Sequence, residues 1–406
     1  MRTPEVFQKH LSPAEEVTTG AAHPRVVFLT NIIPPYHKPL LDRLSRRYVH
    51  MRILLSTRME SNRAWKLEWE GLDVVVQKTL TLNGLWRHPK GFRERLYIHL
   101  PLDTISQLRR FKADVVISWE MGTRTMLAAA YRWTHRGSRL IVWAEFAEST
   151  EYGRGYFRQS LRKVLHHAID AFLVTGESGA RYLRHIGVPD RKIFKIAYTT
   201  DVQRFADAPI TRTPESAWRL LYVGQLIARK GLLEFLSVLS RWAMLHPERQ
   251  VEFVLAGNGP LRESLQTMPI APSLKLTFLG EVAYDILTDV YRRAGLFVLP
   301  TFADTWGVVV NEAMAAGLPI LGSVYGQAVS ELVEDEVSGW TFRPDVAEEM
   351  LDAIDKSLNT SREKLDEMRA AARAMALRFT PEYVSELIES AITASASQAE
   401  RGRAHG

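Results

Sequence analysis

The sequence predicts an α/β protein with two doubly wound, Rossmann-like domains. Short apolar runs alternate with longer stretches of helical periodicity, and this alternation is typical of parallel strands joined by helices. The pattern occurs twice, before and after a segment rich in Ala, Thr and Pro. A length of 406 residues, 46% of them hydrophobic, suits two globular domains of ordinary size.

The domain boundaries follow from changes in composition. We expect a polar tail at 1–24, a first domain at 25–205, a linker at 206–216, a second domain at 217–378 and a final helix at 379–397. The linker is predicted from its prolines among small and polar residues. The tail lacks the continuous apolar core of a signal peptide, so we expect it to be poorly ordered.

Each domain is predicted to contain one sheet. In the first domain, strands are predicted at 26–30, 51–56, 73–78, 114–119, 140–145, 171–175 and 194–198. In the second domain, they are predicted at 220–224, 251–257, 274–280, 296–300, 319–323 and 340–342. These runs are short and mostly apolar, as expected of parallel strands that are buried on both faces.

Composition excludes several classes of protein. The sequence has no cysteine, which excludes disulfides and thiolate metal sites. No apolar run approaches the ~20 residues that a membrane-spanning helix needs. We therefore expect a cytoplasmic protein, either free or associated with the cytoplasmic face of the membrane.

Charge is divided unevenly between the two halves. Residues 1–210 carry 33 Lys and Arg against 20 Asp and Glu, whereas the remainder carries 19 against 26. The segments 86–97 and 152–163 place aromatic residues among the cations, and each cation near an anionic leaflet can contribute about 1 kcal/mol. A solvated basic face is the alternative. No nucleic-acid-binding module accompanies the charge, so we expect no nucleic-acid partner.

Two carboxylates flank the turn after the strand predicted at 296–300. Thr305 can cap the helix that follows, which places Asp304 ahead of the helix and Glu312 roughly two turns into it. Unpaired N–H groups near Gly307 and Val308 would attract a phosphate. The alternative is that Asp304 is a second cap and Glu312 lies on a solvated helix face.

Two adjacent cations, Arg229 and Lys230, follow the strand predicted at 220–224. Such a pair can neutralise a diphosphate, with the Arg binding it bidentately. This matters in any reaction that has a diphosphate as its leaving group, because negative charge builds on the diphosphate as the bond to it breaks. The alternative is an ordinary pair of surface cations.

The turn that carries Asp304 and Glu312 resembles the signature of the retaining glycosyltransferases of family 4. Their GT-B fold has two Rossmann-like domains facing across a cleft, and their final helix packs back on the first domain. Asp304 stands where the family usually has Glu. By the resemblance, Asp304 would hold donor-sugar hydroxyls, Glu312 the ribose, and Arg229 and Lys230 the diphosphate. Gln225 stands where many members have a further Arg.

Other donor-site candidates lie in the loops after the strands of the second domain. Glycine turns allow the backbone to approach a ligand closely, and family members hold the base largely through backbone atoms. The full set of additional donor-binding candidates is Gly224, Gly257, Asn258, Gly259, Gly280, Val282, Thr305, Trp306, Gly307 and Val308. Backbone recognition leaves the identity of the base open.

The first domain is expected to bind the acceptor. Prolines stiffen the loop after the first strand, so Asn31, Tyr36 and His37 are the acceptor-binding candidates. His37 could instead meet an anionic acceptor or the donor phosphates, or be a loop residue without a chemical task.

Many relatives have a His after a central strand of this domain, and here Glu145 follows the matching strand. Glu145 is the first substitute and Glu120 the second. Either carboxylate could orient the acceptor hydroxyl or stabilise positive charge on the sugar ring, or it could be a strand-end residue satisfied by backbone N–H groups. With Asp304, they form the predicted catalytic set.

These features predict a glycosyltransferase that moves a sugar from a nucleotide-diphosphate donor to a hydroxyl of a glycan, lipid-linked or other glycoconjugate acceptor. Retention of the anomeric configuration is implied by the resemblance, as is a role in building polysaccharide. No cofactor or metal is expected, because the two cations can neutralise the diphosphate. A sugar-nucleotide epimerase, a phosphorylase and a non-catalytic sugar-nucleotide-binding protein remain as alternatives.

Overall fold

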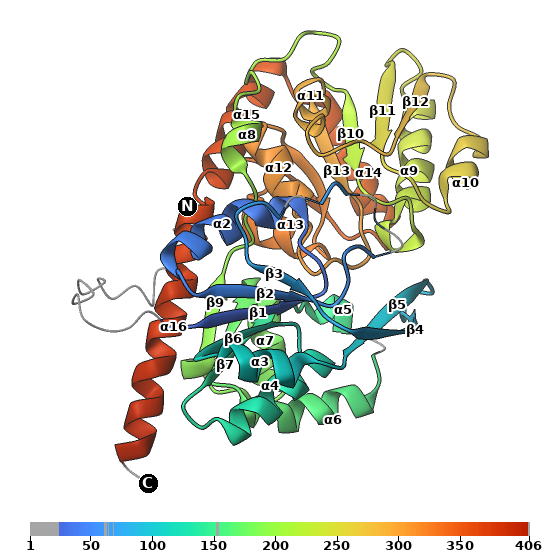
Figure 1. The fold of residues 1–406 in the computed structure, drawn as a ribbon. Coiled ribbons are helices and arrows are strands. Elements are labelled where there is room, and N and C mark those ends of the chain that lie inside the picture. Colours follow the sequence, from blue (N-terminus) through green and yellow to red (C-terminus); the bar gives the residue numbers. More distant parts are fainter. Residues whose placement is uncertain (1–23, 61–62, 64, 68, 152–153, 405–406) are drawn as a thin grey trace. The chain divides into compact units, whose positions relative to one another are not determined.

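The computed structural model describes residues 24–60, 63, 65–67, 69–151 and 154–404. The predicted tail lies outside these residues except for its last position. The chain forms two compact units (Figure 1). Unit 1 contains the described residues up to Arg87, Arg95–Tyr198 and the segment from Pro381 onward, and unit 2 contains His88–Glu94 and Thr199–Thr380. The units therefore divide after Tyr198, ahead of the predicted linker.

Unit 1 is built on a parallel sheet in the order β3-β2-β1-β6-β7-β8-β9. The strands are β1 (Val26–Thr30), β2 (Met51–Leu55), β3 (Val74–Val76), β6 (Val115–Trp119), β7 (Arg139–Ala144), β8 (Ala171–Thr175) and β9 (Ile193–Ile196). Every residue of β1, β6 and β8 is buried, which explains why these strands are continuous apolar runs with little alternation.

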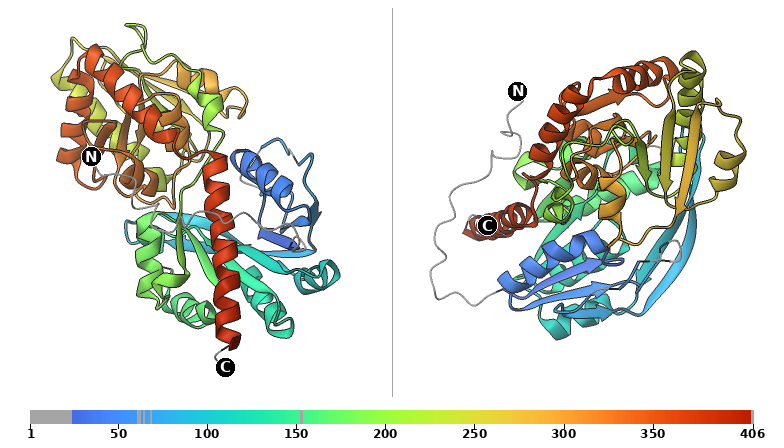
Figure 2. Two further views of the ribbon diagram at one scale, coloured as in Figure 1. Left: turned by 90° about the vertical axis from the view of Figure 1, so that its left-hand side faces the viewer. Right: turned by 90° about the horizontal axis from the view of Figure 1, so that it is seen from above.

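Helices connect and cover the strands of unit 1. They are α2 (Lys38–Arg47), α3 (Thr104–Phe111), α4 (Thr123–Thr134), α5 (Glu148–Glu151), α6 (Tyr156–Leu165), α7 (Gly176–His185) and α16 (Pro381–Ala404). Helices α3 and α4 lie side by side (Figure 1). Helix α16 packs against α2, β7, β8 and β9 (Figure 2), where Arg139 Nη1 donates a 2.6 Å hydrogen bond to the carbonyl of Ile392.

A two-stranded sheet of β4 (Thr79–Arg87) and β5 (Arg93–Pro101) was not predicted. Most residues of both strands are exposed or half-buried, so neither strand has the clear apolar face that marks a strand in the sequence. The residues at the tip, His88–Glu94, belong to unit 2.

Unit 2 is built on a second parallel sheet in the order β12-β11-β10-β13-β14-β15. Its strands are β10 (Leu220–Val223), β11 (Val251–Ala256), β12 (Leu274–Gly280), β13 (Leu296–Leu299), β14 (Ile320–Ser323) and β15 (Gly339–Phe342). Its helices are α8 (Val202–Ala206), α9 (Leu232–Leu245), α10 (Arg262–Thr267), α11 (Leu287–Arg292), α12 (Val309–Ala315), α13 (Gln327–Leu332), α14 (Ala347–Asn359) and α15 (Arg362–Ala376).

The predicted fold class, two doubly wound Rossmann-like domains, is confirmed. In each sheet the strand order reverses beside the first strand, between β1 and β6 in unit 1 and between β10 and β13 in unit 2. Open α/β sheets bind ligands outside the carboxyl ends of their strands at such a switch point. None of the helices in the described part of the chain is long and apolar enough to cross a bilayer.

Candidate functional site

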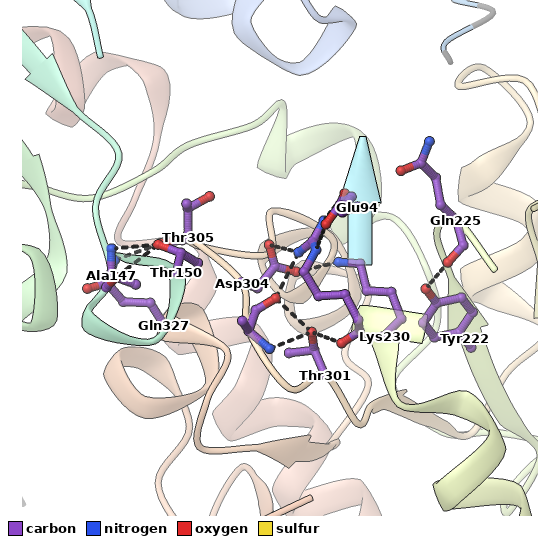
Figure 3. Close-up of polar contacts among 12 residues, drawn as sticks. Glu94, Ala147, Thr150, Tyr222, Gln225, Lys230, Thr301, Asp304, Thr305 and Gln327 are labelled. Carbon is purple, nitrogen blue, oxygen red and sulfur yellow. Dashed lines mark hydrogen bonds and ion pairs between the residues drawn. The ribbon is translucent and has the colours of Figure 1, made fainter. Parts of the chain in front are cut away.

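The switch point of unit 2 carries a cluster of charged side chains. Arg229 and Lys230 lie in a 3₁₀ turn after β10, and Asp304 lies in the loop after β13. Lys230 Nζ forms an ion pair with Asp304, and Arg229 Nη1 lies 3.5 Å from Asp304 Oδ1 (Figure 3). Arg229 Nε also donates to Glu94 Oε2 at 2.7 Å. The two residues predicted to bind the diphosphate therefore contact the residue predicted to bind the donor sugar.

The cluster balances its own charge. Asp304 is only 9% exposed; burial alone would raise the pKa of its carboxyl, but Lys230 and Arg229 lower that pKa below its usual value. Burial lowers the pKa of Lys230 despite the opposing effect of Asp304. Two cations meet the two carboxylates of Asp304 and Glu94, so an anionic ligand has to compete with these carboxylates for Arg229 and Lys230.

Backbone contacts fix the position of the cations. Gly231 follows them with φ +66°, and a Cβ at this position would lie 2.1 Å from the carbonyl oxygen of Pro300. The Phe302 N–H and the Thr301 hydroxyl both donate to the carbonyl of Arg229, at 2.8 Å and 3.1 Å. A glycine is therefore required where the loops after β10 and β13 come together.

The glycine turns of unit 2 have a comparable structural role. A Cβ on Gly257 would lie 1.8 Å from the carbonyl oxygen of Gly224, and one on Gly259 would lie 2.4 Å from that of Leu226. The Gly257 N–H donates to the carbonyl of Gly280 at 2.6 Å. These glycines bring neighbouring loops of the protein together, and their predicted contacts with a donor stay a prediction, as do those of Asn258 and Val282.

The turn before α12 differs from the prediction. Gly307, with φ +97°, turns the chain, and α12 begins only at Val309. Thr305 is therefore not the helix cap; its carbonyl accepts a 2.7 Å hydrogen bond from Gln327 Nε2 (Figure 3). The cap position belongs to Val308, which makes no side-chain cap hydrogen bond.

Trp306 and Glu312 lie in the interior of unit 2. Trp306 is buried, and its Nε1 donates to Asn311 Oδ1 at 2.7 Å. Glu312 lies in the first turn of α12, where the Tyr291 hydroxyl donates to its Oε2 at 2.8 Å. It is 2% exposed, and burial raises its pKa to about 7. Two expectations for Glu312 are therefore wrong. It does not lie on a solvated helix face, and it lies in the first turn of the helix, where the sequence predicted a position two turns in.

The switch point of unit 1 carries a cavity of about 200 Å³. All five residues predicted for the acceptor side line it, because the loops after β1, β6 and β7 meet at this edge of the sheet. These residues are Asn31, Tyr36, His37, Glu120 and Glu145. The lining residues that the sequence did not reveal are Thr30, Ile32, Pro34, Glu60, Arg63, Trp65, Trp119, Arg124 and Tyr198.

Two of the polar groups of this cavity, Glu145 and Arg124, form hydrogen bonds with neutral partners. Trp119 Nε1 donates to Glu145 Oε1 at 2.7 Å. Arg124 is buried; it donates to Asn31 Oδ1, to Ser56 Oγ at 3.1 Å and to the carbonyl of Trp119 at 3.1 Å. Asn31 Oδ1 already accepts a hydrogen bond from Arg124. The predicted contact of Asn31 with an acceptor therefore requires the Asn31 amide to bind Arg124 and the acceptor at the same time.

Glu120 has an unusual backbone conformation. Its φ is +63°, in the left-handed region that non-glycine residues seldom adopt. Its N–H donates to the Trp143 carbonyl at 2.8 Å, and its carbonyl accepts a 2.5 Å bond from the Thr125 hydroxyl. Such strained residues gather at functional sites, and the side chain of Glu120 is exposed at the cavity.

His37 lies among aromatic rings. Its ring centroid is 4.6 Å from that of Trp119 and 5.0 Å from that of Tyr198. The side chain is buried, and Nε2 has no hydrogen-bond partner among the described residues. Burial lowers the pKa of His37 to about 3, so the imidazole is neutral near pH 7. A neutral His37 can meet an anion only as a hydrogen-bond donor, and its contact with an anionic acceptor or the donor phosphates stays a prediction.

Comparison with known proteins agrees with this architecture. Residues 203–375 match the family model of glycosyl transferases group 1. The chain is 27% identical over 210 residues to the alpha-D-kanosaminyltransferase of Streptomyces kanamyceticus, covering 49% of this chain and 53% of that protein. It is 26% identical over 288 residues to the sulfoquinovosyl transferase SQD2 of Arabidopsis thaliana, covering 66% and 54%.

The matches thus span about half the length of these curated relatives, 53% and 54%. Among solved structures, the Anabaena protein HepE in complex with UDP superposes with a TM-score of 0.68 at 16% identity, covering 91% of this chain and 99% of that chain. Likeness at this level of identity concerns the fold. Residues 203–375 therefore resemble the glycosyl transferases group 1 family, and the chain has the two Rossmann-like domains of the GT-B fold.

Proposed function

We propose that the protein is a glycosyltransferase that moves a sugar from a nucleotide-diphosphate donor to a hydroxyl of a glycan, lipid-linked or other glycoconjugate acceptor, with retention of the anomeric configuration. One observation carries the proposal: Arg229, Lys230 and Asp304 meet at the switch point of a domain that matches the group 1 family. Cations at such a point suit a diphosphate, and a carboxylate beside them suits sugar hydroxyls.

The chemistry assigned to these residues is mainly electrostatic. The bond between the anomeric carbon and the diphosphate oxygen breaks, its electron pair leaves with the diphosphate, and a bond to the acceptor oxygen forms. Arg229 and Lys230 stabilise the charge on the leaving group. Asp304, released from these cations, accepts hydrogen bonds from the donor sugar. Glu145 and Glu120 are the candidates to orient the acceptor hydroxyl, whose proton passes to the departing diphosphate.

UDP-sugars are the first donors to test, because the solved structures of HepE contain UDP and UDP-glucose. The assigned roles need no metal, because Arg229 and Lys230 can neutralise the diphosphate. We assign the Glu312 carboxylate to the ribose, which requires it to accept a hydrogen bond in addition to that from Tyr291.

Calorimetry with UDP and UDP-glucose tests the donor site. Lys230→Ala should weaken UDP binding by about tenfold or more, since a charge-assisted contact is lost. Asp304→Asn should strengthen UDP binding, because the competing carboxylate is gone, while it abolishes most transfer. Lys38→Ala is the matched control, since Lys38 forms a 2.7 Å Lys–Asp pair with Asp42 in unit 1. Unchanged UDP affinity in Lys230→Ala would sink the assignment.

The reaction type needs a separate measurement. With donor and acceptor present, NMR of the purified product should give an anomeric configuration that matches the donor. Isomerisation of the sugar nucleotide without acceptor would instead identify an epimerase. Phosphate-dependent cleavage of a glycan would identify a phosphorylase.

We also propose that unit 1 contacts the cytoplasmic face of an anionic membrane through α6. Tyr156 and Phe157 at its start are 89% and 84% exposed, and Lys163 follows on the same helix. Exposed aromatics beside cations are typical of helices that lie in the membrane interface.

The protein should sediment with vesicles that contain phosphatidylserine, and the double variant Tyr156→Ser, Phe157→Ser should not. Trp133→Ser is the control, because Trp133 is exposed on α4. Equal sedimentation of both variants would contradict the assignment.

A further inference from the structure

The cavity of unit 1 is walled by aromatic rings. The Tyr36 ring lies 6.0 Å from Trp65 and 6.0 Å from Tyr198, measured between centroids, and His37 lies between Trp119 and Tyr198. Its volume of about 200 Å³ lies below the ~300–1,000 Å³ of pockets for drug-sized ligands. The cavity therefore suits one ring of a ligand, held by its apolar face.

The charges around the cavity are unfavourable for an anion. Glu60, Glu120 and Glu145 line it, and these three carboxylates outnumber the two guanidinium groups. Arg124 is already engaged with Asn31, Ser56 and the Trp119 carbonyl. Arg63 lies with its guanidinium carbon 4.8 Å from the centre of the Trp65 ring. The carboxylates of the cavity can accept hydrogen bonds from the hydroxyl groups of a ligand. Ionised phosphate or carboxylate groups of a ligand have no hydrogen to donate to them.

One buried polar atom points to a ligand. His37 is 4% exposed, lines the cavity, and its Nε2 lacks a partner among the described residues. A buried nitrogen without a hydrogen bond is costly, and such a group in a native structure calls for an explanation. A hydroxyl can donate or accept, so it can satisfy Nε2 in either tautomer of the imidazole.

We propose that this cavity binds an uncharged sugar ring of the acceptor, with a ring hydroxyl hydrogen-bonded to Nε2 of His37. This inference rests on the proposed function and names the acceptor class of that enzyme. The apolar C–H face of a pyranose packs on the aromatic wall, while its hydroxyls meet Glu120 and Glu145. Acceptors whose terminal group is a phosphate, a phosphorylated cyclitol or a uronic acid are excluded by the carboxylates.

Ligand-observed saturation-transfer NMR on the full chain, without donor, tests the inference. The probes are methyl α- and β-pyranosides of glucose, galactose and mannose, set against glucuronic acid and inositol phosphate. At least one neutral pyranoside should bind saturably at millimolar concentration, and both anionic probes should bind at least about tenfold more weakly. Tighter binding of an anionic probe, or no saturable binding of any neutral pyranoside, would overturn the inference.

Variants with matched controls assign the binding to this cavity. Trp65→Ala and His37→Phe should each weaken the pyranoside by roughly three- to tenfold, as expected for one aromatic wall or one hydrogen bond. Trp133→Ala, on the surface of α4, and His166→Phe, at a buried His whose Nδ1 also lacks a partner, should leave affinity within about twofold.

The conservative variant separates hydrogen bonding from packing. His37→Gln, which keeps a polar atom, should bind the pyranoside more tightly than His37→Phe, with both melting near the wild type. Equal binding by the two variants would contradict the role of Nε2. UDP-glucose calorimetry on the same samples keeps the two proposals apart: donor binding without pyranoside binding overturns only this inference. Pyranoside binding without donor binding contradicts the proposed function and leaves the cavity assignment standing.

Discussion

The two switch points occupy equivalent places in their sheets and have opposite chemistry. In unit 2, Lys230 and Arg229 are already paired with Asp304 and Glu94. In unit 1, Arg124 is held by neutral groups, Glu120 carries a strained backbone, and the buried Nε2 of His37 has no hydrogen-bond partner within the described part of the chain. A ligand of unit 2 would have to displace internal ion pairs, whereas a ligand of unit 1 could supply a hydrogen bond that Nε2 of His37 lacks among the described residues.

The dependence of stability on pH should distinguish the two regions most strongly. Burial lowers the pKa of His37 from 6.5 to about 3, so between these values the unfolded chain binds more protons than the folded one. His37 therefore stabilises the fold above pH 6.5, and this contribution is lost as pH falls toward 3, by up to about 5 kcal/mol. Urea unfolding of His37→Phe at several pH values should show a smaller loss toward acid. Parallel profiles for variant and wild type would contradict this assignment.

The contribution of Glu312 to stability should change with pH in the opposite direction to that of His37. Burial raises its pKa from 4.5 to about 7, so the folded state holds a proton that the unfolded chain releases near pH 4.5. The contribution is present below pH 4.5 and is lost as pH rises through about 7, by up to about 3 kcal/mol. Glu312→Gln should flatten this decline in urea unfolding. Glu363→Gln, at a solvent-exposed acid on α15, should not; equal effects of the two variants would disprove the assignment.

Gly231→Ala should test how rigidly unit 2 holds its cations. The variant combines a left-handed backbone with a Cβ that would overlap the Pro300 carbonyl, so we expect a loss of about 3 kcal/mol of unfolding free energy and weaker UDP binding. Gly71→Ala is the control, because Gly71 has φ +83° with nothing within 4 Å of an added Cβ. Its loss should be about 1 kcal/mol, without effect on UDP. Equal losses at both sites would remove the steric argument.

The smallest expected effect concerns the strained residue of unit 1. At φ +63°, Glu120→Gly should be about 1 kcal/mol more stable than Glu120→Ala, because glycine adopts this conformation without steric cost. Both variants should reduce transfer. Lys112, with φ 55° at the end of α3, provides the control, since Lys112→Gly should gain the same stability over Lys112→Ala without loss of transfer. Greater stability of Glu120→Ala would show that the backbone is not strained.

Much of the fold was predictable because buried parallel strands leave a strong local signal. The strands of both large sheets were predicted from short apolar runs that tertiary packing did not override. The β4–β5 pair was missed because its strands are largely exposed and lack the buried apolar runs of the two large sheets. The start of α12 was misplaced because Thr305 looked like a helix cap, whereas the positive φ of Gly307 delays the helix until Val309.

The candidate sites were predictable where a functional residue directly follows a strand. Asn31, Glu120 and Glu145 were found in this way, as were the residues around Asp304. The sequence did not reveal partners from distant parts of the chain. Arg124 contacts Asn31, 93 positions away in the sequence, and Glu94 contacts Arg229, 135 positions away. Two predicted donor-binding residues have internal partners that the sequence did not reveal: Trp306 is bonded to Asn311 and Glu312 to Tyr291, and both are buried.

Helix α16 has a consequence for synthesis of the chain. Val384 and Ile388 on this helix are fully buried, and the helix belongs to unit 1 although unit 2 precedes it in the sequence. On a ribosome, which adds about 5–20 residues per second, the whole of unit 2 emerges before the first domain receives its last helix. The domain whose translation begins first is thus completed only after unit 2 has been made, and the surface of β8 and β9 that α16 covers stays exposed until α16 has emerged.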